Sequence, residues 1–360
     1  MKKTLLLIST KAITLNSFFD EFIKNDKFNI ILACSDPENL NFKKNKIKLS
    51  YDLKFLNIIN PFFFFSKIIK NYFILKRLNY DYVLINTPLA ALYLRLVLFF
   101  TQKKTIYLVH GFRFHKSEKK LSSLFFFIYE KLYSYITKHY IVLNREDFNI
   151  IIKMFKKDKS NILKIPSIGI DYKKLIKRTH TKTNKIFNVG VISAYRNNKG
   201  YPDLIKIAHN LQKKKLNIRF NCYGYDSKND YIKKIKKLKL KNIVLNDYNK
   251  QIYNKIKNFD LVCHLSRREG MPISLLEAIA IGVPVIAYNI RGNNDIITNK
   301  FNGVLVKPYD IHNFEFKLIM LSQNPKMLRF LRSNCKKSVD FLHDKKKITL
   351  MINKFIDNVE

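Results

Sequence analysis

Short apolar runs rich in β-branched and aromatic residues recur along the chain, and longer segments with helical periodicity separate them. In the N-terminal half these runs occupy residues 4–8, 28–33, 82–85, 105–109, 140–143 and 162–165. A second series occupies residues 187–192, 219–223, 242–245, 261–265, 284–287 and 304–306. Buried strands that alternate with helices are typical of a parallel sheet covered by helices. The pattern therefore predicts an α/β fold with two sheets in tandem.

A polar stretch without apolar periodicity separates the two series and predicts the domain organisation. The length of 360 residues also corresponds to two domains of about 150 residues each. We expect a Rossmann-like domain at residues 1–170, a linker at 171–185, a second such domain at 186–335 and a helical segment at 336–360 that packs back towards the first domain. Since parallel sheets bind ligands beyond the carboxyl ends of their strands, two such domains facing each other would form a cleft.

Composition indicates a globular protein with an anionic partner. Apolar residues make up 47% of the chain, and 67 Lys and Arg against 27 Asp and Glu give a net charge of +40. Such a charge favours nucleic acid, a phosphorylated ligand or a membrane surface, although the codon bias of an A/T-rich genome would also enrich lysine. The four cysteines form no C-x-x-C pair, which argues against a disulfide framework or zinc ribbon and for a reducing cytoplasm.

Apolar stretches with basic neighbours raise the question of membrane contact. No uninterrupted apolar run reaches the roughly 18 residues of a spanning helix. The nearest are residues 61–65, 88–100 and 121–128, each flanked by lysine or arginine. These segments suit either ordinary core helices or a protein lying on an anionic bilayer. We expect a cytoplasmic location, with peripheral contact at the inner face of the plasma membrane as an open alternative.

The segment at residues 266–284 has the most informative pattern, because it predicts a loop and a short helix directly after the strand at 261–265. Pro272 suits the first position of a helix and Gly282 the position past its end. Free amides and the helix dipole at such a start favour a diphosphate. Glu269 and Glu277 bracket this start, and carboxylates can accept hydrogen bonds from sugar and ribose hydroxyls. A surface role for Glu269 and a capping or salt-bridge role for Glu277 remain alternatives.

Two further segments place cations and a histidine at the ends of predicted strands. Arg196 and Lys199 follow the strand at 187–192, where cations would stabilise a departing diphosphate unless they simply belong to a solvated loop. His110 follows the strand at 105–109 and could bond a sugar hydroxyl or phosphate, or be a structural histidine. No D-x-D sequence occurs, and His110 and His115 lack the spacing of a metal site, so no metal is expected.

Taken together, these segments resemble the family-4 glycosyltransferases of the two-domain GT-B type, in the branch that builds bacterial capsules and exopolysaccharides. The resemblance covers most of the chain. The residues that carry it are 268–287, 291–293 and 302–303, with blocks at 110–116, 143–147 and 165–171. It implies a retaining, metal-independent hexosyltransferase that takes a sugar from a nucleotide-activated donor.

The resemblance also assigns roles to individual residues. Glu269 matches the first glutamate of the family's E-x7-E motif, on the donor sugar, and Glu277 matches the second, on the ribose. Lys199 matches the phosphate-binding lysine, and His110 the first-domain histidine near the reaction centre. The expected catalytic residues are Glu269, His110 and Lys199. Many members have an arginine five residues before that lysine, where this chain has Ala194, and Arg196 is the candidate substitute. The other expected donor contacts are Gly270, Met271, Pro272, Ser274 and Leu275, and the expected acceptor side comprises Phe112, Arg113, His115 and Lys116.

The branch further implies the substrates. We expect a UDP-hexose or UDP-N-acetylhexosamine donor, a lipid-linked oligosaccharide acceptor, no separate cofactor and no nucleic-acid partner. Two alternatives stay open. A sugar-nucleotide 2-epimerase shares the two-domain fold and would convert its substrate with no acceptor present. A basic nucleic-acid-binding protein would bind duplex with an affinity that falls steeply with salt.

Overall fold

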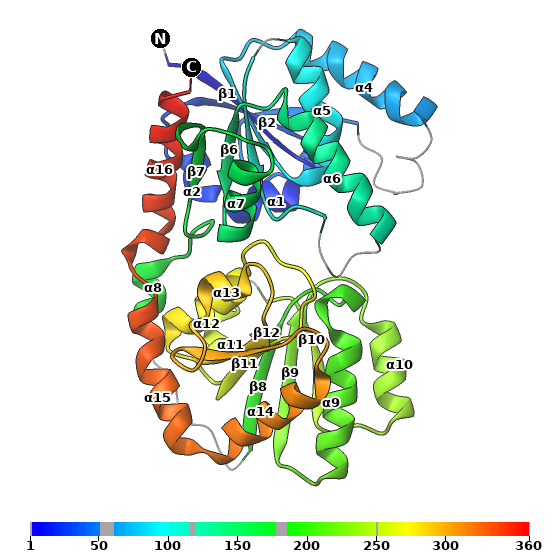
Figure 1. Ribbon diagram of the computed structural model, residues 1–360, viewed down its shortest axis with the longest axis vertical. Coiled ribbons are helices and arrows are strands. Elements are labelled where there is room, and N and C mark those ends of the chain that lie inside the picture. The colour runs from blue at the N-terminus through cyan, green and yellow to red at the C-terminus, as the bar shows by residue number, and fades with distance from the viewer. Residues whose placement is uncertain are drawn as a thin grey trace. The chain divides into compact units, whose positions relative to one another are not determined.

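The protein consists of two compact units, each built on one parallel sheet (Figure 1). The computed structural model describes residues 2–50, 61–101, 103–114, 120–177, 186–249 and 251–359. The first unit comprises Met1–Gly169 and Lys345–Glu360, and the second comprises Ile170–Asp344. The predicted α/β fold with two parallel sheets in tandem is therefore confirmed.

The first unit has seven strands in the order β3-β2-β1-β4-β5-β6-β7. Their bounds are β1 Thr4–Ser9, β2 Asn29–Cys34, β3 Asn45–Lys48, β4 Tyr82–Asn86, β5 Lys104–Val109, β6 His139–Val142 and β7 Ile162–Lys164. Six of them lie at the predicted apolar runs. The sequence analysis missed β3, because this lysine-bearing edge strand is largely exposed and has no apolar run. Charged residues on an edge strand also discourage pairing with another chain.

The second unit has six strands in the order β10-β9-β8-β11-β12-β13, and all six were predicted. Their bounds are β8 Phe187–Ile192, β9 Ile218–Gly224, β10 Ile243–Asp247, β11 Leu261–His264, β12 Val285–Tyr288 and β13 Gly303–Val306. In chain order this is the 3-2-1-4-5-6 arrangement of doubly wound sheets. The strand order reverses between β8 and β11, and in the first unit it reverses between β1 and β4. Ligands of such sheets bind at these reversal points.

Helices cover both sheets. In the first unit they are α1 Ala12–Phe18, α2 Asp20–Lys24, α4 Pro61–Lys76, α5 Pro88–Phe100, α6 Lys120–Ser134, α7 Arg145–Lys153 and α16 Lys345–Asp357. In the second they are α8 Tyr172–Ile176, α9 Tyr201–Lys213, α10 Asn229–Lys237, α11 Tyr253–Ile256, α12 Ile273–Ile281, α13 Asn293–Ile296, α14 Ile311–Gln323 and α15 Pro325–Cys335. Within the residues that the structure describes, no helix has both the length and the apolar composition needed to cross a bilayer.

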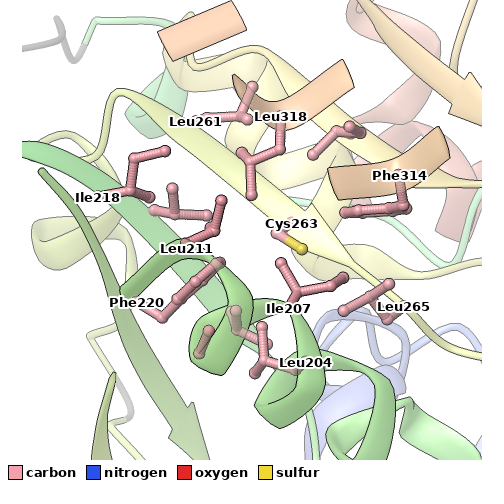
Figure 2. Close-up of a cluster of buried hydrophobic side chains, with 14 of the residues drawn as sticks. Leu204, Ile207, Leu211, Ile218, Phe220, Leu261, Cys263, Leu265, Phe314 and Leu318 are labelled. Carbon is pink, nitrogen blue, oxygen red and sulfur yellow. The ribbon is translucent and has the colours of Figure 1, made fainter. Parts of the chain in front are cut away.

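The core of the second unit fixes the helix that follows β8. Leu204, Ile207 and Leu211 project from α9 towards the sheet (Figure 2). There they join Phe220 and Cys263 from the strands, and Phe314 and Leu318 of α14 belong to the same buried cluster. Burial of each large apolar side chain stabilises the unit by about 1.5–3 kcal/mol. The start of α9, and the loop before it, is therefore held firmly at the reversal point of the sheet.

The chain passes between the two units at residues 169–170, within one residue of the expected end of the first domain, and at residues 344–345 instead of the expected 335–336. Helix α8 lies inside the stretch expected as a linker, and its Leu175 is buried in the second unit, while residues 178–185 lie outside the described residues. Residues 336–344 stay with the second unit, so only α16 and the residues after it join the first. There Asn353 Nδ2 donates to Asn25 Oδ1 at 2.8 Å, and Lys104 Nζ donates to Val359 O at 3.2 Å.

Candidate functional site

Two loops meet at the reversal point of the second sheet. One follows β8 and runs through a single 3-10 turn at Asn197–Lys199 into α9, and the other follows β11 and leads into α12. The strands themselves are paired in parallel, with Leu261 opposite Val189. The amide of Arg267 donates to Asn198 O at 2.9 Å, which ties one loop to the other. The two sequence segments that suggested anion binding are therefore neighbours in space.

A glycine permits this close approach. Gly200 has a φ of +82°, and a Cβ atom there would lie 2.1 Å from the carbonyl oxygen of Leu265. Only glycine combines a left-handed backbone with the absence of a side chain at that contact. Gly292 has a similar role on the other side of the loop, because a Cβ atom there would lie 2.6 Å from Gly270 O. Both contacts shape the backbone around the start of α12.

Glu269 is the centre of the site and is held by two donors. Lys199 Nζ donates to Glu269 Oε1 at 2.6 Å, and His264 Nε2 donates to the same oxygen at 3.0 Å. Burial alone would raise the pKa of Glu269, but the Lys199 ammonium and the His264 hydrogen bond outweigh it and hold this pKa well below its usual range. The carboxylate is therefore ionised at neutral pH. Both of these donors bind Oε1, and neither engages Oε2.

The start of α12 lies in the same loop. Pro272 is the residue before the helix, and no side chain caps its first amides. Helix N-termini with uncapped amides attract anions. Ser274 and Glu277, on the first turns, are half-buried. Burial and then the Glu277 carboxylate raise the pKa of Tyr248, so this phenol, from the loop after β10, lies near that acid.

Arg196 lies at the edge of the site. Its guanidinium pairs with Asp226 and lies 5.9 Å from the ring centre of Tyr225. Tyr225 in turn makes an edge contact with Tyr248, with ring centres 6.3 Å apart. The sequence analysis did not single out His264, Tyr225 or Tyr248. His264 falls inside a predicted strand, and nothing in its spacing marked it as a partner of Glu269.

His110 lies in the first unit, directly after β5. Its Nε2 donates to Asn86 Oδ1 at the end of β4, and its ring stacks on Phe18 with centres 5.3 Å apart. Burial lowers the pKa of His110 to about 4, so the ring is neutral at pH 7. With the proton on Nε2, the other ring nitrogen can accept a hydrogen bond. Among the side chains that the structure describes, no three of His, Cys, Asp and Glu gather into a possible metal site.

Of the four residues expected on the acceptor side, the structure describes Phe112 and Arg113. Phe112 is wholly buried and stacks on Phe114, so its side chain cannot face an acceptor. Arg113 lies over the ring of Phe126 at 4.3 Å, and His115 and Lys116 lie outside the described residues.

The residues expected to contact the sugar-nucleotide donor differ in how accessible they are. Leu275 is also wholly buried, and its amide donates to Pro272 O at 3.1 Å within the first turn of α12. Pro272 has no amide hydrogen to offer a phosphate. Gly270 and Met271 are half-buried beside Glu269 in the loop.

A doubly wound sheet with a cation, a carboxylate and a helix start at its reversal point is the arrangement in which such sheets commonly bind nucleotides. Residues 173–338 match the family model "Glycosyl transferases group 1". This segment therefore forms a group 1 glycosyltransferase domain, and the protein is a glycosyltransferase.

Relatives and solved structures extend the similarity to nearly the whole chain. An Escherichia coli UDP-Gal:alpha-D-GlcNAc-diphosphoundecaprenol alpha-1,3-galactosyltransferase is 26% identical over 98% of this chain and 95% of its own. The capsular polysaccharide biosynthesis glycosyltransferase CapM of Staphylococcus aureus is 23% identical over 93% of this chain and 91% of its own. The crystal structure of Anabaena Alr3699/HepE in complex with UDP and glucose superposes with a TM-score of 0.75 at 16% identity, over 99% of this chain and 100% of that one. The fold is of the GT-B type.

Proposed function

We propose that the protein transfers a hexose or N-acetylhexosamine, with retention and without a metal ion, from a UDP-sugar to a lipid-linked saccharide in surface polysaccharide synthesis. The observation that carries this proposal is the Glu269 carboxylate. Lys199 and His264 keep it ionised through Oε1, and it lies in the loop before a helix start that no N-cap side chain caps. The E. coli relative is named for a UDP-sugar donor and a diphosphoundecaprenol acceptor, and HepE was solved with UDP and glucose. Both names support the same substrate classes here.

The donor would bind along the loop between β11 and α12. Glu269 Oε2 accepts hydrogen bonds from the sugar hydroxyls, and Glu277 accepts them from the ribose. The amides of the first turn of α12 and the Lys199 ammonium neutralise the diphosphate. Arg196, beside Tyr225, is the candidate for a second cation on the phosphates. These groups supply positive charge from the chain itself, which is why we propose transfer without a metal ion.

The chemical step is a front-face displacement. The bond between the anomeric carbon and the diphosphate oxygen breaks, and the acceptor oxygen forms its bond on the same face of the ring. The acceptor proton moves to the departing phosphate oxygen, so the chain needs no general base. Lys199 and the helix amides stabilise the charge that develops on the leaving group. The imidazole of His110, which is neutral at pH 7, accepts a hydrogen bond from a hydroxyl of the donor sugar and so orients the sugar ring.

The test is a donor panel with and without acceptor. UDP-glucose, UDP-galactose and their N-acetyl counterparts are each incubated with EDTA and a short-chain polyprenyl diphosphate sugar. We expect UDP release only when the acceptor is present, and a product whose anomeric configuration, read by NMR, equals that of the donor. Conversion of a sugar nucleotide to its 2-epimer without acceptor would instead identify an epimerase. Release that stops in EDTA and returns with a divalent cation would contradict metal-independent transfer.

A pair of matched variants ties the activity to the site. Glu269→Gln removes the charge that Lys199 and His264 hold, and we expect transfer to fall at least about 100-fold, the range of one lost transition-state contact. Glu315→Gln is the control, because Glu315 is a buried acid in the same unit whose partners Lys214 and Asn210 lie outside the site. Equal activity of both variants would contradict the assignment of Glu269.

A further inference from the structure

Helix α4 of the first unit exposes an apolar stripe on the side opposite its buried residues. Ile68 and Leu75 are buried towards the sheet. Phe62, Phe65, Ile69 and Phe73 are all more than half exposed, and Phe62 reaches 77%. Their spacing of three, seven and eleven residues from Phe62 places them on one face of a helix. An amphipathic helix normally carries polar residues on that face.

Helix α6 repeats the pattern. Phe126 and Tyr129 are buried, whereas a row of apolar side chains points outward. The row comprises Leu121, Leu124, Phe125, Ile128 and Leu132, and Leu121 is 82% exposed. Counted from Leu121, these residues stand at three, four, seven and eleven positions, which again is one helical face. Two helices of one unit thus present apolar residues both to the core and to the outside.

The two stripes belong to one layer of helices. Helix α5 contacts α4, with Phe64 and Tyr93 ring centres 4.9 Å apart. Leu92 of α5 shares a buried cluster with Phe126 of α6, and Phe64 of α4 packs against the same cluster. Figure 1 shows α4, α5 and α6 on one flank of the first unit. Phe99 and Phe100, at the end of α5, are also more than half exposed. We call the two stripes with Phe99 and Phe100 the apolar face. Single exposed apolar residues are common, but a set of this size on one layer marks an interaction site.

The charges on this layer have one sign. Lys67, Lys70 and Lys76 lie on α4 and Lys131 on α6, and the three helices contain a single acid, Glu130. Glu130 is buried and accepts a hydrogen bond from Arg95 Nη2 at 2.7 Å. Its charge is therefore balanced inside the layer and does not offset the lysines outside.

A basic cavity lies where α5 and α6 end. Its volume is about 300 Å³, and among the described residues that line it are Lys103, Lys104, Lys138 and His139 and no acid. Arg95 also lines it, but its charge is paired with Glu130. Phe99 of the apolar face also lines it. A cavity with this lining fits a phosphate group, and the neighbouring apolar side chains fit the acyl chains attached to one. Apolar residues with adjacent cations are the combination by which proteins bind anionic membrane surfaces.

We propose that the apolar face of α4, α5 and α6 docks on an anionic phospholipid bilayer, with lipid phosphates at the basic cavity. A bilayer accounts for both features, because its interior accepts the phenylalanine and leucine side chains and its headgroups attract the lysines. The inference goes beyond the proposed transfer reaction, since docking requires neither donor nor acceptor. Vesicle binding tests the docking proposal and sugar transfer tests the proposed function, so the failure of one is distinguishable from the failure of the other.

The test is flotation of the purified full-length protein with vesicles. We expect binding to phosphatidylglycerol-containing vesicles at least ten times stronger than to phosphatidylcholine vesicles. The quadruple variant Phe62→Gln/Phe65→Gln/Leu124→Gln/Ile128→Gln should lose at least ten-fold in binding. The control Phe316→Gln/Phe330→Gln/Leu350→Gln changes side chains that are also more than half exposed, on α14, α15 and α16, and should bind like the wild type.

A second pair of variants separates local charge from the overall +40. Lys70→Glu/Lys76→Glu should weaken binding to anionic vesicles, whereas Lys233→Glu/Lys236→Glu on the basic helix α10 should not. Equal losses in both pairs would show general attraction and overturn the assignment to this face. Wild-type protein that binds no vesicle would also overturn it. So would a wild-type dimer that the quadruple variant converts to monomer without any vesicle binding, because the occupant would then be a second copy of the chain.

Discussion

Replacing Lys199 by alanine removes the ion pair between Lys199 and Glu269. The substitution removes the ammonium that donates to Glu269 Oε1 at 2.6 Å and that, in the proposed reaction, stabilises the leaving diphosphate. Loss of one such donor typically lowers kcat by a factor of about 100–1,000, or about 3 kcal/mol of transition-state stabilisation. Glu269 keeps only the His264 hydrogen bond, so its pKa should rise towards its ordinary value.

The assay is steady-state UDP release with the cognate donor and acceptor. We expect Lys199→Ala to lower kcat about 100-fold or more, and Lys199→Arg to recover part of the loss because it restores a cation. Lys214→Ala is the matched control, since Lys214 also donates to a glutamate of the second unit, Glu315, at 2.7 Å. A kcat for Lys199→Ala within about threefold of the wild type would refute the role of this lysine at the leaving group.

Three further predictions concern stability. Burial lowers the pKa of His110 to about 4 from an unfolded value near 6.5, so between these pH values the unfolded state binds a proton that the folded state does not. The free energy of unfolding should therefore fall by up to about 3 kcal/mol as the pH drops from 6.5 to 4. Thermal melts of His110→Gln should show a weaker dependence of stability on pH over this range. Gly200→Ala should cost at least about 1–3 kcal/mol in urea unfolding of the second unit, since its Cβ would meet Leu265 O, and an unchanged midpoint would contradict the tight contact. Glu130→Ala should destabilise the first unit by about 3–5 kcal/mol, because it leaves the buried Arg95 guanidinium without its carboxylate partner. A calorimetric loss of less than about 1 kcal/mol in the free energy of unfolding would contradict this.

The sequence was most informative where strands are buried on both faces. Strands of this kind, such as β4 and β12, appear as continuous apolar runs. Every predicted run became a strand, including the less buried β9 and β10. The edge strand Asn45–Lys48 has the opposite character, with exposed polar side chains, and periodicity could not reveal it. The linker position was less predictable, because the short helix α8 contributes only Leu175 to the core and its surroundings are polar.

The site was predictable residue by residue but not as an arrangement. Lys199 and Glu269 each follow a predicted strand, yet their contact depends on β8 and β11 being neighbours, which the sheet order decides. The contact of His264 with Glu269 is local instead, because His264 ends β11 and Glu269 lies five residues later in the loop after that strand. Phe112 belongs to a segment that resembles a family block, but its ring packs between Phe114 and Phe155 in the core, and composition alone gave no sign of that.

The most direct test of the central claim is a calorimetric comparison of UDP and UDP-sugar binding by the wild type and Glu269→Gln. If Glu269 Oε2 holds the sugar ring, the wild type binds the cognate UDP-sugar more tightly than UDP, and the variant loses only that increment. Hydrogen bonds to a charged group contribute about 1.5–3 kcal/mol, so the expected loss is about 10- to 100-fold in Kd for the UDP-sugar, with the Kd for UDP unchanged. A variant that binds both ligands as the wild type does would contradict the account.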